Sequence, residues 1–167
     1  QLGTGAFANS SVPVAVSGGL SFTSITTHQV VTCGITADSA GYCWGEGAKG
    51  NLGSGTSSSS NVPAPIMGGL KFTSLQLGVW TTCGVAADGD GYCWGMNGSG
   101  ELGIGAKNPE ESLEPTKVVD GHKWKSISLG AAVNCGVTTD DGGLCWGGNE
   151  WGERGDGAFP SPDVTSP

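Results

Sequence analysis

Apolar residues in this chain occur in short runs, and glycine, proline or small polar residues interrupt them about every ten positions. In the first fifty residues this pattern is typical of four short strands, at residues 12–16, 21–26, 30–36 and 42–45. No apolar run approaches the roughly 20 residues that a membrane span requires. The pattern therefore predicts an all-β chain of short strands and tight turns.

The whole pattern repeats along the chain. A Leu-Gly-x-Gly motif occupies residues 2–5, 52–55 and 102–105 and returns in degraded form at residues 154–157, and the first two units share 23 of 50 positions. We therefore divide the chain into repeat 1 (1–50), repeat 2 (51–100), repeat 3 (101–152) and the start of a fourth, partial repeat (153–167). A four-stranded unit of this length favours the radial repetition of a β-propeller.

The six cysteines form three pairs at identical spacing. In each unit the first cysteine precedes the second by ten residues, and Trp-Gly follows the second. Zinc usually requires Cys-x-x-Cys or nearby histidines, so the spacing favours one disulfide per unit, across the hairpin of the third and fourth strands. The expected disulfides imply an oxidising compartment, so we expect a secreted or extracellular protein. The pairs are Cys33 with Cys43, Cys83 with Cys93, and Cys135 with Cys145.

The sequence resembles the regulator of chromosome condensation repeat family. The resemblance rests on Leu-Gly-x-Gly, a following proline, Gly-Gly-Leu-x-Phe-x-Ser-Ile, Thr-Cys-Gly-Ile-Thr and Gly-Tyr-Cys-Trp-Gly, all in register along the chain. It implies a propeller of seven four-stranded blades, and the Cys-Trp-Gly form is similar to secreted versions. The chain departs from the family in carrying three repeats, and in having Val31, Thr81 and Val133 where a histidine often stands.

Three repeats do not close a ring of seven. Two explanations stay open: the chain is a fragment of a longer protein, or it is completed by self-association, with two or more copies forming a ring or stacking head to tail. Exposed blade edges would otherwise invite uncontrolled pairing.

Composition and charge narrow the range of functions. The 32 glycines and 8 prolines disfavour long helices. The net charge of −8 disfavours nucleic acid and anionic lipid as partners. The only histidines, His28 and His122, have no catalytic partner implied by their spacing, and no catalytic motif stands out. We therefore expect no enzyme, no cofactor and no metal centre.

Three local features invite a functional interpretation. Asp88-Gly89-Asp90-Gly91 hints at calcium, but a hairpin turn explains it more simply. Asn9 and Asn97 begin possible N-glycosylation sequons in expected loops. Of the six tryptophans, Trp80 and Trp151 do not recur between units and are the better candidates for an exposed contact.

These observations predict a non-catalytic extracellular scaffold that binds a protein through variable blade loops. The segments 6–12, 56–62 and 107–114 hold the same place in each unit and differ most. The third is acidic at Glu110, Glu111 and Glu114, which suggests a basic partner surface. The alternative is a structural subunit of an extracellular oligomer or fibre. The resemblance also implies guanine-nucleotide exchange as a remote alternative, which the disulfides and the acidity disfavour.

Overall fold

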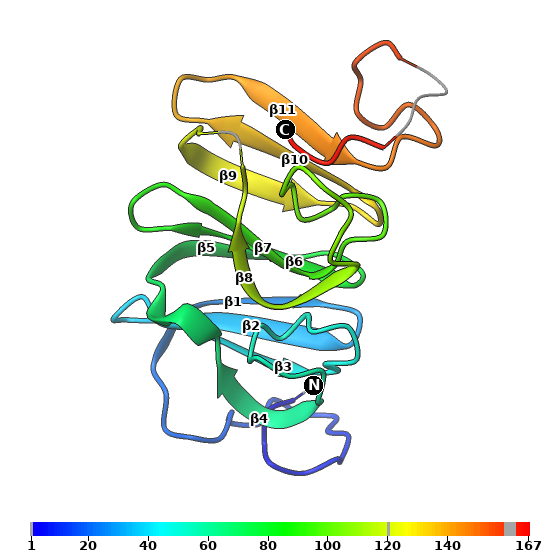
Figure 1. Cartoon of the computed structure of the whole chain (residues 1–167). Coiled ribbons are helices and arrows are strands. Elements are labelled where there is room, and N and C mark those ends of the chain that lie inside the picture. Colours follow the sequence, from blue (N-terminus) through cyan, green and yellow to red (C-terminus); the bar gives the residue numbers. More distant parts are fainter. Residues whose placement is uncertain (1, 120, 159–162) are drawn as a thin grey trace.

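The computed structural model describes residues 2–119, 121–158 and 163–167. In them the chain forms three antiparallel sheets, which stack face against face as three propeller-type blades (Figure 1). Blade 1 comprises, in spatial order, β1 (Phe22–His28), β2 (Val31–Thr36), β3 (Gly41–Gly45) and β4 (Ser60–Pro65). The predicted all-β fold of four-stranded blades is confirmed.

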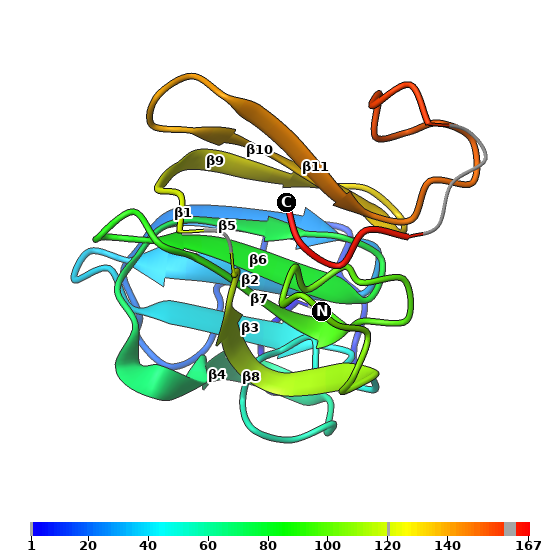
Figure 2. The ribbon, with the colours of Figure 1, turned by 45° about the horizontal axis from the view of Figure 1, so that its top comes forward.

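Blades 2 and 3 follow the same order. A short 3₁₀ turn, η1 (Met67–Gly69), leads into blade 2, which comprises β5 (Phe72–Leu77), β6 (Thr81–Ala86), β7 (Gly91–Met96) and β8 (Glu111–Lys117). Blade 3 comprises β9 (Trp124–Leu129), β10 (Val133–Thr138) and β11 (Gly143–Gly147), with its fourth position marked by a single bridge between Gly147 and Val164 (Figure 2). No helix of the described residues has the length and apolar character to cross a membrane.

Blades and sequence units are out of phase by one strand. The outer strand of blade 1, β4, comes from repeat 2, and the outer strand of blade 2, β8, comes from repeat 3. The expected strand at residues 12–16 is not formed. The corresponding strands β4 and β8 pair with the third strand of the blade before them, and no described strand takes that place beside residues 12–16. In repeat 2 the corresponding strand begins at Ser60, earlier than the pattern predicts.

The hydrophobic core lies between the blades rather than within them. Ile35 and the disulfide Cys33–Cys43 of blade 1 pack against Phe72, Leu75 and Trp94 of blade 2. The corresponding groups of blade 2 pack against blade 3: Val85, Cys83 and Cys93 contact Trp124, Ile127 and Trp146. Each blade thus covers the disulfide-bearing face of the blade before it, which excludes water from a face that a lone sheet would expose.

The structure joins the cysteines in the expected pairs. Each pair lies directly opposite in the hairpin register, with Cα atoms 4.0–4.1 Å apart and sulfur atoms at bonding distance. The described residues contain no free cysteine.

The two repeated motifs contact each other through a buried hydrogen bond. The indole Nε1 of Trp94 donates to the backbone oxygen of Asn51, the residue before Leu-Gly-x-Gly, at 3.1 Å. Trp146 donates in the same way to Glu101 at 2.9 Å. Gly53 has φ of +66°, and a Cβ there would lie 2.7 Å from the Trp94 Nε1. Glycine is therefore required here both for the positive φ and for the close approach.

Candidate functional site

The variable segments at residues 56–62 and 107–114 each lead from the third strand of a blade to its outer strand, from β3 to β4 and from β7 to β8. Glu110, Glu111 and Glu114 are all exposed there. Glu111 and Glu114 lie on β8, so the surface loop expected over residues 107–114 is shorter than predicted. Two of the three glutamates, Glu111 and Glu114, therefore lie on the outer strand of blade 2, and Glu110 directly precedes that strand.

Asn97 holds the loop before these glutamates through side-chain hydrogen bonds. Its side-chain amide donates to the backbone oxygens of Ala106 and Pro109, both at 3.0 Å, and its Oδ1 accepts from the Leu102 N–H at 3.1 Å. The residue has no exposed surface. A glycan on Nδ2 is incompatible with this arrangement, so Asn97 is not a modification site in the folded chain. Asn9, the other candidate, is exposed, and its modification stays a prediction.

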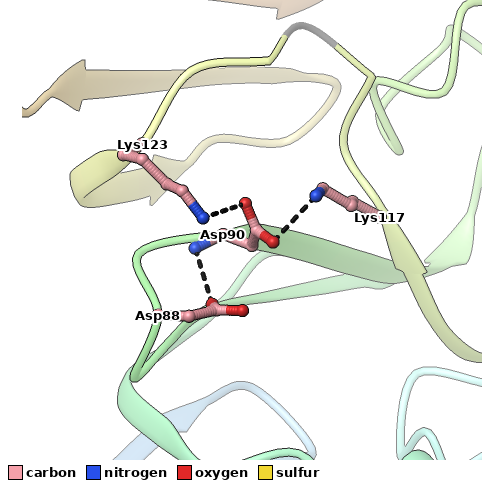
Figure 3. Close-up of polar contacts among 4 residues, drawn as sticks. All are labelled: Asp88, Asp90, Lys117 and Lys123. Carbon is pink, nitrogen blue, oxygen red and sulfur yellow. Dashed lines mark hydrogen bonds and ion pairs between the residues drawn. The ribbon is translucent and has the colours of Figure 1, made fainter.

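The calcium-like turn of repeat 2 holds a cluster of charges (Figure 3). The carboxylate of Asp90 pairs with Lys117 at 2.7 Å through one oxygen and with Lys123 at 2.8 Å through the other. The Asp90 backbone N–H donates to Asp88 at 3.0 Å, which closes the turn. Lys117 lies on β8 and Lys123 precedes β9, so one carboxylate links the turn of blade 2 to the outer strand of its own sheet and to blade 3.

The electrostatics of this cluster follow from its hydrogen bonds. The hydrogen bond from Lys117, and then that from Lys123, lowers the pKa of Asp90, and the same contact raises the pKa of Lys117. Both oxygens of Asp90 are therefore engaged by ammonium groups and are not available to a cation. The described residues contain no group of three or more potential metal ligands.

A related ion pair joins blades 1 and 2. Lys71, which corresponds to Lys123, contacts Asp38 on the turn of blade 1 at 2.9 Å. The hydroxyl of Thr36, followed by Lys71, lowers the pKa of Asp38 to about 2. The turns of blades 1 and 2 are thus each bound electrostatically to the residue that precedes the first strand of the next blade. On blade 3, the hydroxyl of Thr138 lowers the pKa of the corresponding Asp140.

The tryptophans divide as their spacing indicates. Trp44, Trp94 and Trp146 are buried, and Trp124 belongs to the core. Trp151 is 83% exposed and lines a cleft of about 340 Å³ together with Glu150, Glu153 and Ala132. Trp80 is only half-buried. Trp151 therefore offers the larger exposed aromatic contact, beside two carboxylates.

The repeat sequence identifies the protein family. The sequence profile of the regulator of chromosome condensation (RCC1) repeat matches residues 41–85 and 88–137, more than half of the chain. The chain belongs to the RCC1-repeat family. No match is found among curated protein sequences.

Solved structures share the fold of this RCC1-repeat chain. Prp20p from Saccharomyces cerevisiae is 22% identical with a TM-score of 0.78, over 87% of this chain and 37% of Prp20p. Human WBSCR16 is 15% identical with a TM-score of 0.80, over 92% of this chain and 38% of that protein. The ectodomain of the receptor kinase CR4 from Physcomitrella patens is 26% identical with a TM-score of 0.53, over 79% and 29%. The chain therefore spans less than two fifths of each.

Sequence reasoning missed the role of Asp90, and one signal could have found it. Among the three units, the second alone has an aspartate at this place in the turn; Ala40 and Gly142 stand at the corresponding positions. Lys71 and Lys123 recur at the start of the second and third blades. The sequence therefore shows both partners, Asp90 and Lys123. It does not show that the turn of one blade contacts the start of the next blade.

Proposed function

We propose that this RCC1-repeat chain is a non-catalytic, extracellular scaffold that binds a protein partner through its variable blade segments. Membership of the repeat family supports the scaffold. Prp20p, which shares the fold, is described as binding Gsp1p and histones, and a second structure holds yeast RCC1 bound to Kap60. Three disulfides in a chain of this size support a place outside the reducing cytosol.

The exposed acidic group on a hydrogen-bonded support is the observation that carries this proposal. Glu110, Glu111 and Glu114 are solvent-exposed. The buried Asn97 holds the loop that leads to Glu110, and Glu111 and Glu114 lie on β8. A fixed group of like charges attracts an opposite charge without first having to be ordered, which favours both affinity and association rate. The partner surface is therefore basic.

A lysine-rich peptide serves as the test ligand. Replacing the three acids together (Glu110→Gln, Glu111→Gln, Glu114→Gln) is expected to weaken binding by about 3- to 100-fold, since each exposed ion pair contributes about 0.2–1 kcal/mol. Fluorescence anisotropy at physiological salt measures the affinity. The matched control is Asp88→Asn, Asp140→Asn and Asp141→Asn, which removes the same charge from other exposed positions. An equal loss in both variants would show that only net charge matters and would contradict the proposal.

A structural, self-assembling role is the second candidate, and a specific observation favours it. The disulfide-bearing face of blade 3 and the opposite face of blade 1 keep apolar side chains exposed that are buried at the corresponding positions in the middle of the stack. Contiguous exposed apolar surface of this kind marks protein–protein contact sites. An extracellular oligomer or fibre would use these two faces.

A further inference from the structure

A cleft of about 340 Å³ opens between two successive turns of the stack, one from repeat 2 and one from repeat 3. Ser99 lies on the first turn and Trp151 on the second, at corresponding places in their repeats. A Cβ on Gly148 would lie 3.3 Å from the Ala132 Cβ and 3.8 Å from the Ser99 Cβ. The cleft is therefore bounded by segments from both sides of the contact between blades 2 and 3.

Small residues of repeat 3 make room for this cleft. The N–H of Gly148 donates to the carbonyl of Ala132 at 2.9 Å, and the N–H of Met96 donates in the same way to Trp80 at 2.9 Å. Met96 and Trp80 thus hold the corresponding places in blade 2, with far larger side chains. The cleft comes from these differences within the repeat, between blades that the described chain itself supplies.

The walls of the cleft carry an indole and a carboxylate that both face solvent. Trp151 is 83% exposed, and Glu150 is exposed beside it. The corresponding residues of the two earlier turns are also exposed or half-exposed, although a further blade follows each turn: Ala48, Lys49, Gly98 and Ser99. The outward position is thus a property of the turn, and only the turn of repeat 3 places an aromatic ring and a carboxylate there.

Hydrogen bonds fix the shape of the turn that carries this indole. The Trp151 N–H donates to the Glu153 carboxylate at 2.8 Å. The buried Asn149 accepts from the Arg154 N–H at 3.1 Å through its Oδ1, and its side-chain amide donates to the Ala158 carbonyl at 2.7 Å. The turn is therefore held in place before a ligand arrives, which lowers the entropic cost of binding.

The local charge indicates the class of ligand. Three carboxylates line the cleft, those of Glu150, Glu153 and Asp163, and the ammonium group of Lys107 pairs with Asp163 alone. An indole face attracts a cation, and a carboxylate beside it adds a charged hydrogen bond. Arginine combines both contacts, because its planar guanidinium stacks on an aromatic ring and pairs with a carboxylate through two parallel hydrogen bonds.

We propose that this cleft is a subsite for an arginine side chain of the partner, with the guanidinium stacked on Trp151 and paired with Glu150. The proposal rests on the scaffold function above and gives its basic partner a point of attachment. The volume of about 340 Å³ is near the lower end of the range for ligand sites, about 300–1,000 Å³, which suits one side chain.

The cleft also lies close to the acidic group of the proposed binding surface. The N–H of Asn97 donates to the carbonyl of Glu110 at 2.7 Å, and Ser99 of the cleft follows two residues later. A single basic segment can therefore contact the glutamates around β8 and place an arginine in the cleft.

Two peptides of equal charge test the subsite. One is lysine-rich with arginine at its central position, and the other has lysine there. Fluorescence anisotropy at physiological salt measures both affinities. The wild type is expected to bind the arginine peptide at least about threefold more tightly, because an ammonium group is a point charge and lacks the planar, two-bonded contact.

Trp151→Ser gives the turn the residue of repeat 2 and removes the indole. It is expected to weaken the arginine peptide by about 2- to 30-fold, as the strength of a cation–π contact allows, and to abolish the preference over lysine. Val119→Ser, at a 51% exposed apolar position outside the cleft, is the matched control and leaves both affinities unchanged.

Glu150→Gln tests the carboxylate separately. It is expected to weaken the arginine peptide by up to about fivefold, as an exposed ion pair allows. Asp88→Asn removes the same charge from another exposed position and is its control, with little effect on the preference. Equal effects of the two changes would mean that Glu150 acts only through net charge, and would overturn its pairing with the guanidinium.

The outcomes separate the subsite from the function on which it rests. A wild type that binds neither peptide overturns both. Equal affinities for the two peptides, with the expected loss in the Glu110, Glu111 and Glu114 variant, overturn the arginine subsite while the scaffold function stands. A preference for arginine that survives Trp151→Ser arises elsewhere on the surface and overturns the assignment to this cleft.

Discussion

At the scale of single residues, the most informative contact is the buried indole hydrogen bond. Trp94 and Trp146 each donate to the residue that precedes Leu-Gly-x-Gly, so the two most recognisable motifs of the repeat form one structural unit. Thr82 donates to the same Asn51 oxygen at 2.8 Å. A single buried carbonyl thus accepts two hydrogen bonds, which satisfies a backbone group that the turn leaves without a strand partner.

Trp94→Phe is expected to lower the free energy of unfolding by about 2–4 kcal/mol. The change removes one hydrogen bond and leaves a cavity beside Gly53, while Thr82 keeps the Asn51 carbonyl satisfied. Chemical denaturation followed by circular dichroism measures the loss. Trp151→Phe is the matched control, and because Trp151 is exposed its effect should stay within about 0.5 kcal/mol. Equal effects of the two changes would contradict this assignment.

The limits of sequence reasoning at this scale are visible in Asn97. The sequon was evident, and the loop was expected, but a motif does not show which way a side chain points. Asn97 points inward and satisfies the backbone of residues 102, 106 and 109. The recurring Trp44, Trp94 and Trp146 are buried, because a large apolar side chain at one position in every unit has a shared environment to fill.

At the scale of strands and turns, the principal finding is that each outer strand belongs to the following repeat. The three strands that follow one another in each blade, the hairpin turns and the cysteine pairing could all be predicted, because they depend on neighbours within about ten residues. The pairing of β3 with β4 could not, since a run of apolar and polar residues does not identify its partner strand. The same limit explains the strand wrongly predicted at residues 12–16.

Asp90→Asn is expected to lower the free energy of unfolding by about 1–3 kcal/mol at neutral pH. The asparagine loses the charge that engages Lys117 and Lys123, and charged hydrogen bonds of a buried carboxylate have this magnitude. Thermal or urea unfolding measures the difference. Asp141→Asn, which breaks a highly exposed pair with Lys125, is the control and should change stability by less than about 1 kcal/mol.

The pH dependence gives an independent check on Asp90. Its pKa is lowered in the folded chain, so its contribution is complete above the unfolded value of about 3.9 and is lost as pH falls through the folded value. The stability difference between the wild type and Asp90→Asn should therefore be constant near neutral pH and shrink in acid. A difference that grows in acid would mean that the carboxylate is not held by the two lysines.

At the scale of the whole molecule, burial depends on position in the stack. The disulfides of blades 1 and 2, which the following blade covers, are fully buried, whereas Cys135–Cys145, which no described blade covers, is partly exposed. The repeated spacing predicts three disulfides of the same local geometry. It does not predict how far each disulfide is buried, because the burial depends on the neighbouring blade.

Limited reduction should distinguish the three disulfides. Cys135–Cys145, which is partly exposed, is expected to react first with a soluble thiol, and Cys33–Cys43 and Cys83–Cys93, which are fully buried, should react later. Stepwise alkylation followed by peptide mass spectrometry identifies the order. The two buried pairs serve as internal controls for each other. Simultaneous loss of all three pairs would indicate global unfolding before reduction and would contradict this prediction.

The one-strand offset has a consequence for how such a chain can be lengthened by gene duplication. Repeats 2 and 3, each of about fifty residues, deliver the last strand of one blade and the first three of the next. A duplicated segment of that length can therefore enter at any point in the period, because it always supplies one complete set of four strands. A junction at a repeat boundary then lies within a single hydrogen-bonded sheet. Because one face of that sheet is buried, the strand register across the junction is strongly specified.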